Sequence, residues 1–198
     1  MSPRLRDGLI LLALVATAIL LATVAPTDRI LGSSLHVVYL HGAWVWAALL
    51  AFAAAAITGL IGFILHNQGL HRWSVGLGRS ATVFWLTSLL LSLAAMETSW
   101  NGLFLAEPRW QLGVRFGVAA VLLQIAVSVL PRPRLGSAVN IVYFGLLAAA
   151  LLAAPSVMHP PSAVFSSVST TLRYSFLALL ACAAACAGWL ARLLRPNA

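Results

Sequence analysis

Charged residues are scarce in this chain: they make up 8% of its 198 residues, whereas hydrophobic residues make up 62%. Lysine is absent, and acidic residues number only 4. Soluble domains carry roughly 25% charged residues, so this composition excludes a soluble globule and indicates an integral membrane protein. So few acids also argue against proton-coupled transport through the helices.

Cysteine is nearly absent as well. Cys182 and Cys186 lie in the last apolar run at a spacing that puts both on one helix face. Helix geometry disfavours a disulfide between them, and their alanine-rich context predicts a close helix-packing surface. The sequence contains neither a Cys-x-x-Cys metal motif nor a Cys-x-x-Cys-His motif for covalent haem. No nucleophile–base set or phosphate loop is evident, so we do not expect a stand-alone enzyme.

Long apolar runs, by contrast, fill the sequence. A transmembrane helix needs roughly 20 apolar residues, and six runs of about this length can be placed between the charges. We therefore expect an all-α fold: one domain over residues 1–198, an integral membrane bundle of six transmembrane helices with short loops and small residues at the contacts. The first run is long for a cleaved signal peptide, so we expect it to be retained. The runs are 8–25, 36–65, 80–96, 114–130, 138–158 and 172–190.

The arginines predict the orientation of this bundle. With the N-terminus in the cytoplasm, most of them fall on the cytoplasmic side, as the positive-inside rule requires. We expect a multi-pass protein of the cytoplasmic (inner) membrane with both termini cytoplasmic. Because the arginines are scattered, we expect no nucleic-acid partner. The inner set is Arg4, Arg6, Arg72, Arg79, Arg132, Arg134, Arg192 and Arg195, and the outer set is Arg29, Arg109, Arg115 and Arg173.

Two histidines, His66 and His71, fall on the expected inner side, in the polar stretch 65–73. They would bind a metal only weakly in this context. A second haem there would need another ligand, and that side has no further histidine. We predict a short turn whose long side chains reach the membrane surface.

Two other histidines, at the expected outer ends of the second and fifth runs, carry the functional prediction. His41 lies in a Tyr-Leu-His-Gly-Ala-Trp sequence, and His159 lies in a Val-Met-His-Pro-Pro sequence. Neutral imidazole supplies the lone pair that haem iron needs, and Gly42 would let a planar ligand approach the backbone. The residues alone leave another interpretation open, in which His41 is an interfacial histidine and Trp44 belongs to an aromatic belt.

The longest outer loop, 97–116, combines aromatic rings with both signs of charge. Its glycine and proline argue against one uninterrupted helix. Trp100 and Trp110 would pack on a porphyrin plane, and Arg109 or Arg115 would pair with a propionate. The alternative is an amphipathic loop that lies on the lipid headgroups and is held by its own ion pairs.

Together these elements resemble the CcmC/CcsA family, the haem-handling proteins of cytochrome c maturation. The sequence around His41 is similar to the family's outward Tyr-Ile-His motif followed by Ala-Trp. The segment 98–115 resembles its tryptophan-rich outer loop, and 155–159 resembles its second outward histidine after a proline. The order, sidedness and helix count agree over nearly the whole chain. The resemblance implies that His41 and His159 ligate haem b and that the tryptophan loop presents it to an acceptor.

The chain also departs from the family pattern. Its loop holds fewer tryptophans, Gly113 stands near the place of an aspartate before the arginine, and Pro160 with Pro161 follows the second histidine. Two functions therefore stay open. The protein is either a haem handler that transfers haem b, closer to a chaperone than to a catalyst, or a haem-b-bearing electron-transfer or anchor subunit of a larger membrane redox complex. The expected partners are haem, membrane lipid, and a haem acceptor or other subunits on the outer side.

Overall fold

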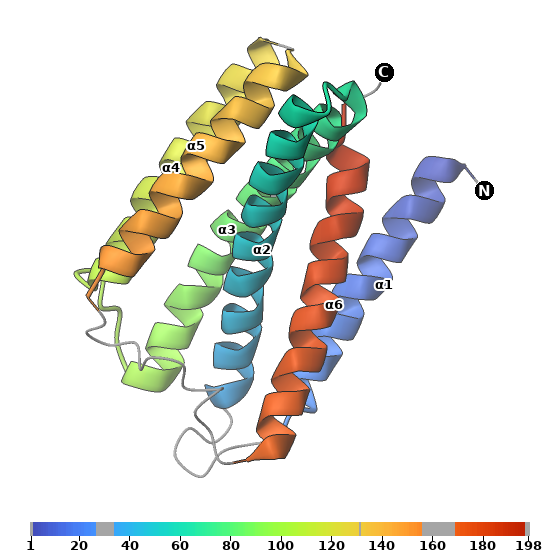
Figure 1. The fold of residues 1–198 in the computed structure, drawn as a ribbon. Helices are drawn as coiled ribbons and strands as arrows, with labels where there is room; N and C mark the ends of the chain where they lie inside the picture. Colours follow the sequence, from blue (N-terminus) through green and yellow to red (C-terminus); the bar gives the residue numbers. More distant parts are fainter. Residues whose placement is uncertain (1, 27–33, 131, 156–168, 197–198) are drawn as a thin grey trace.

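The computed structural model describes residues 2–26, 34–130, 132–155 and 169–196, and all regular structure within these ranges is helical. Each of the six helices is long and apolar enough to cross a membrane, which confirms the all-α, six-span prediction. They run antiparallel in succession, so both ends of the chain lie at the same end of the bundle (Figure 1). The helices are α1 (Pro3–Thr23), α2 (Ser34–Ile64), α3 (Gln68–Trp100), α4 (Pro108–Val129), α5 (Pro133–Ala153) and α6 (Thr170–Leu194).

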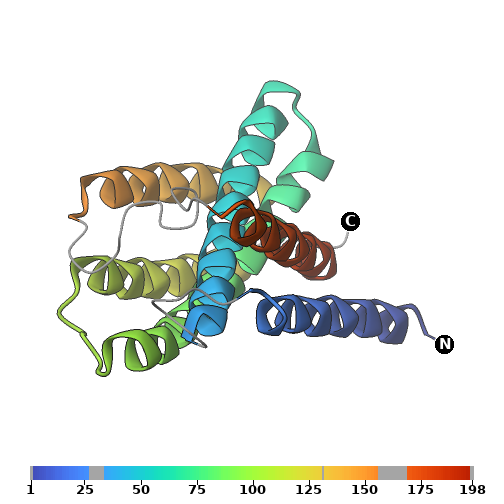
Figure 2. The same cartoon turned by 90° about the horizontal axis from the view of Figure 1, so that it is seen from below.

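The helices α2 and α3 form the centre of the bundle and pack along each other more extensively than any other pair. On one side, α5 contacts both central helices while α4 packs on α3 and α5; on the other side, α6 contacts both and carries α1. The view along the bundle shows this division (Figure 2). We call the end with the chain termini the termini end and the opposite end, where α2 begins, the far end.

Small residues line the helix contacts, as expected where lipid offers no hydrophobic driving force and close backbone approach must supply the attraction. On α2, buried alanines recur at helical spacing toward α3 and its neighbours. On α5, a Cβ added at Gly136 would lie 2.5 Å from a methyl group of Val75 in α3. The buried alanines of α2 are Ala43, Ala47, Ala48, Ala51, Ala55 and Ala56.

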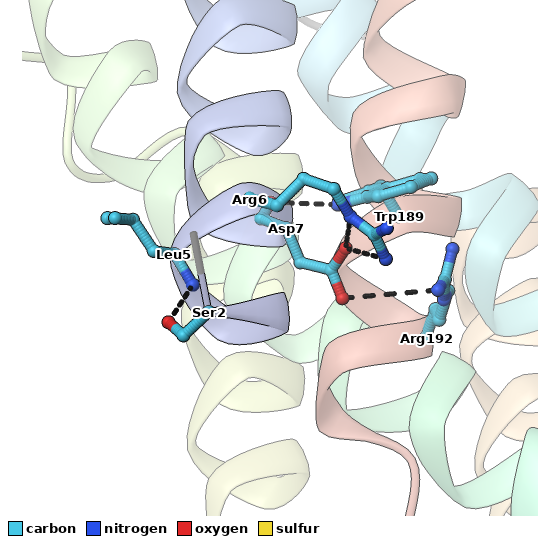
Figure 3. Close-up of polar contacts among 6 residues, drawn as sticks. All are labelled: Ser2, Leu5, Arg6, Asp7, Trp189 and Arg192. Atoms are coloured by element: carbon cyan, nitrogen blue, oxygen red, sulfur yellow. Dashed lines mark hydrogen bonds and ion pairs between the residues drawn. The ribbon is translucent and has the colours of Figure 1, made fainter.

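The contact between α1 and α6 confirms the predicted role of the two cysteines. Both are free thiols; Cys186 is buried, and the Cys182 Sγ donates to the Leu14 carbonyl oxygen at 3.4 Å. At the termini end, Asp7 accepts from Arg6 at 3.4 Å and lies 4.0 Å from Arg192 of α6. The Trp189 indole N–H donates to the Asp7 backbone carbonyl at 2.9 Å (Figure 3). Polar contacts of Asp7 at the termini end therefore add to the small-residue packing between α1 and α6.

An aromatic layer crosses the middle of the bundle. It consists of Phe52 of α2, Trp85 of α3, Phe116 of α4 and Tyr143 of α5. The Phe52 ring centroid lies 4.8 Å from that of Tyr143 and 6.3 Å from that of Trp85, and the Tyr143 hydroxyl donates to the Phe116 carbonyl at 3.0 Å.

The predicted short turn is present at residues 65–67, but the expectation that its long side chains reach the membrane surface is wrong for His71. Asn67 caps α3 through a hydrogen bond from the Leu70 N–H, so this helix begins at Gln68 rather than near residue 80. His66 lies in the turn, exposed and with φ of 50°. His71 does not reach the membrane surface: it is completely buried, because a serine of α5 supplies its hydrogen bond inside the bundle.

Candidate functional site

His41 lies on α2 near the far end, roughly 10 Å along the axis from the first residue of the helix. Its ring is half-buried and its Nδ1 is 3.1 Å from the backbone carbonyl oxygen of Ser88 in α3. His41 shares a helix face with Phe52, which contacts α3 and α5 through the aromatic layer. The histidine therefore faces the seam between α3 and α5.

The Ser88 carbonyl fixes the tautomer of the His41 ring. A carbonyl oxygen only accepts, so the hydrogen of this bond is on Nδ1. Metal-binding histidines use this arrangement: one ring nitrogen donates to a carbonyl and the other coordinates. His36, the other histidine of this helix, is held differently, because its Nε2 is 3.2 Å from the Ala25 carbonyl.

Trp44 and Gly42, which we expected near the haem, contact other helices instead. The Trp44 indole stacks on Phe84 with ring centroids 4.8 Å apart, and its N–H donates to the Thr87 hydroxyl at 3.0 Å. One face of Trp44 is therefore covered by α3. A Cβ on Gly42 would lie 3.4 Å from the Phe176 ring, so this glycine faces α6 and not the seam that His41 faces.

The loop between α3 and α4 breaks the helix, as its glycine and proline predicted. Asn101 ends α3 with φ of 54°, and α4 starts at Pro108. Glu107 is buried and caps α4 by accepting from the Trp110 backbone N–H at 2.7 Å. Trp100 packs at the end of α3 with its ring edge against Phe104. The tryptophans of this loop therefore lie at the far end of the bundle, as expected.

Two side-chain donors at the start of α4 are buried without a partner in the described part of the chain. They are the Arg109 Nε and the Trp110 Nε1, on neighbouring residues. An unpaired buried N–H group is costly, so a pair of them needs an acceptor. A carboxylate is the acceptor that matches an arginine and an indole N–H, since each of its oxygens can take such a bond.

Arg115 lies on a different face of α4. Gly113 and Gly117 face Leu89 of α3, whereas Arg115 lines a groove of about 360 Å³ between α4 and the far end of α5. The structure therefore does not bring Arg115 together with His41. The second expected ligand, His159, lies outside the described residues; Pro155, the last described residue before it, lines the same groove.

Sequence reasoning missed a buried polar cluster near the termini end, between α2, α3 and α5. The His71 Nδ1 is 2.8 Å from the Ser137 Oγ, and the Ser74 Oγ donates to the Ala55 carbonyl at 2.8 Å. The Asn140 amide donates to the Ser74 carbonyl at 2.8 Å. The available signal was serine and histidine recurring at helical spacing within an apolar run, since such residues in a span mark interhelical contacts.

No family of known proteins, no curated protein and no solved structure matches this chain. What can be said about the kind of protein therefore comes from its residues and its fold. It has six helices that could span a membrane, and polar side chains are buried inside the bundle.

Proposed function

We propose that the protein binds haem b at the far end of the bundle, with His41 and His159 as the axial ligands, and presents it to an acceptor in cytochrome c maturation. The observation that carries the proposal is the hydrogen bond between the His41 Nδ1 and the Ser88 carbonyl. It holds the His41 ring through Nδ1 and fixes its plane, as a backbone carbonyl does for many histidines that bind metals.

The helix arrangement supports a role for His159. Residues 154–169 join α5 to α6, and both helices contact α2, the helix that carries His41. A chain extends by at most roughly 3.5 Å per residue, so His159 can lie no more than about 20 Å from the end of α5 at Ala153. Within that limit, His41 and His159 would together hold the haem iron.

The unpaired donors at the start of α4 support the same ligand. Haem carries two propionate carboxylates, and the Arg109 Nε and Trp110 Nε1 offer two buried N–H groups at the far end. Arg115 does not take this role in the proposal, because it faces the groove between α4 and α5. The bound haem would supply an iron centre; the chain's own groups would orient it and neutralise its carboxylates.

The test compares absorbance spectra of the purified wild type with those of the variants H41A, H159A and the double variant. We expect reduced haem content or an altered spin state in each single variant and no haem in the double variant, because one remaining ligand still holds the iron in part. The matched control is H36A, which removes an imidazole from the same helix but not from the seam. A double variant with wild-type haem content, or a wild type that takes up no haem on reconstitution, contradicts the proposal.

Haem release then distinguishes transfer from permanent retention. A handler should lose haem to an apo-cytochrome or another apo-protein acceptor added in excess. A subunit for electron transfer should instead keep its haem through that challenge and titrate reversibly between oxidation states. Retention would leave the ligands in place but reject the role in cytochrome c maturation.

A further inference from the structure

A small cavity of about 70 Å³ opens toward the termini end, where the first part of α3, the end of α4 and the segment after α6 meet the start of α5. It lies at the opposite end of the helices from His41, so it is separate from the proposed haem site. Two arginines and a serine give it a polar lining on an otherwise apolar wall. The lining residues are Val75, Arg79, Val127, Ser128, Arg132, Pro133 and Pro196.

The Arg79 side chain is fixed in the wall of this cavity. Its Nη1 donates to the Leu194 carbonyl at the end of α6 at 3.0 Å, and its Nη2 donates to the Ser128 hydroxyl at 3.2 Å. A guanidinium has five N–H donors, so these two bonds leave others for a ligand. Because the side chain is already held in place, binding a ligand costs it little conformational freedom.

The positive charge at the cavity is not neutralised within the described residues. Arg132 lies beside Arg79 in the lining, is exposed, and occupies the N-cap of α5 without a side-chain capping bond. The ion pairs found in the described chain use Asp7, with Arg6 and Arg192 as its partners. Two arginines without a carboxylate partner therefore face one small space, and the uncapped start of α5 adds partial positive charge.

We propose that this cavity binds the phosphate group of an anionic phospholipid. Its volume suits a phosphate rather than a larger anion, and arginine pairs with phosphate through two parallel N–H bonds. The site lies at one end of the membrane-spanning helices, where lipid headgroups are abundant and basic cavities between helices bind them.

The test is lipid binding measured by native mass spectrometry. The purified full chain, in micelles with phosphatidylcholine, is titrated with phosphatidylglycerol. We expect one phosphatidylglycerol to bind tightly to the wild type, and the variant R79Q/R132Q to bind it roughly 25-fold more weakly, because each arginine contributes about a factor of five. The matched control R72Q/R134Q removes the same charge from the same end of the bundle but not from the cavity, and it should keep wild-type affinity.

Two further measurements control for misfolding of the double variant and distinguish a lipid phosphate from free phosphate. The single variant R132Q changes an exposed side chain and should lower the affinity roughly fivefold. Inorganic phosphate at the same concentration should not displace the lipid. Equal losses in both double variants would show diffuse surface attraction, and no loss in R79Q/R132Q or R132Q would show no site; either result overturns the proposal. Full displacement by inorganic phosphate would overturn the lipid assignment.

Discussion

His71 is a buried histidine with one satisfied ring nitrogen: its Nδ1 has a partner, whereas its Nε2 has none within the described residues. It is completely buried, it pairs with Ser137 of α5 at 2.8 Å, and its ring packs edge-on against Phe63 of α2. A Cβ on Gly62 would come within 3.0 Å of the imidazole, so the glycine makes room for it. One histidine therefore ties three helices together near the termini end.

This arrangement predicts the effect of removing the imidazole. H71A leaves the Ser137 hydroxyl buried without its partner, and an unsatisfied buried group costs roughly 1–3 kcal/mol. We expect the free energy of unfolding in mixed micelles to fall by that amount. The control H66N changes the exposed histidine of the neighbouring turn to a residue that tolerates its positive φ, and it should leave stability unchanged. Equal stability of H71A and the wild type would show that the contact contributes nothing.

The different outcomes for the histidines show what sequence can and cannot predict at this scale. The helix that carries His41 and its end of the bundle followed from hydropathy and charge, and the structure agrees. The partner of His71 could not be predicted, because the sequence gives a residue's helix face but not which helix lies opposite. For the same reason, the sequence could not show that Arg115 faces the groove between α4 and α5 and not the seam that His41 faces.

The α5 helix offers a test of small-residue packing within one element. A Cβ at Gly136 would lie 2.5 Å from a Val75 methyl group and 3.0 Å from one of Val127, whereas a Cβ at Gly145 would meet nothing within 4 Å. We expect G136A to destabilise the protein by about 1–3 kcal/mol through overpacking.

The matched change on the same helix has the opposite sign. G145A should stabilise by about 0.5–1 kcal/mol, since alanine costs less conformational entropy in a helix interior. The check is a pair of unfolding curves measured under one set of conditions. Stabilisation of equal size in both variants would show that helix propensity, and not contact with α3 and α4, sets the effect.

At the scale of the element, the largest difference between expectation and structure is the start of α3. Arginines and polar residues between 68 and 80 indicated a loop at the membrane surface, but these side chains find partners on other helices. Arg79 reaches the Leu194 carbonyl at the end of α6, and Ser80 donates to the Ala187 carbonyl at 2.7 Å. Tertiary contacts therefore extend the helix beyond its apolar run, which local hydropathy cannot show.

The arginines are distributed unequally between the two ends of the bundle. Arg72, Arg79 and Arg132 lie at the termini end with most of the others, whereas Arg109 and Arg173 lie at the far end. This asymmetry supports our proposal that the termini end faces the cytoplasm. The six-helix architecture was predictable because it depends on the number and length of apolar runs, whereas the lateral order of the helices depends on contacts between side chains far apart in the chain.

Labelling of single cysteines tests the orientation. In a background with both native cysteines replaced by alanine, L103C lies in the exposed loop of the far end and Q68C at the exposed start of α3. An impermeant maleimide should modify L103C in intact cells and Q68C only after permeabilisation. The reverse pattern would place the termini outside and with them the phosphate cavity.

The aromatic layer has a consequence for the electrical integrity of the membrane. Moving one charge across 100 mV is worth about 2.3 kcal/mol, so an unbroken chain of polar groups would let protons run down that gradient. The rings of Phe52, Trp85 and Tyr143 lie between the polar groups near His41 and those near His71. The bundle thus keeps polar side chains toward both ends and places packed rings between them, which lengthens the route that a proton would have to follow from one end to the other.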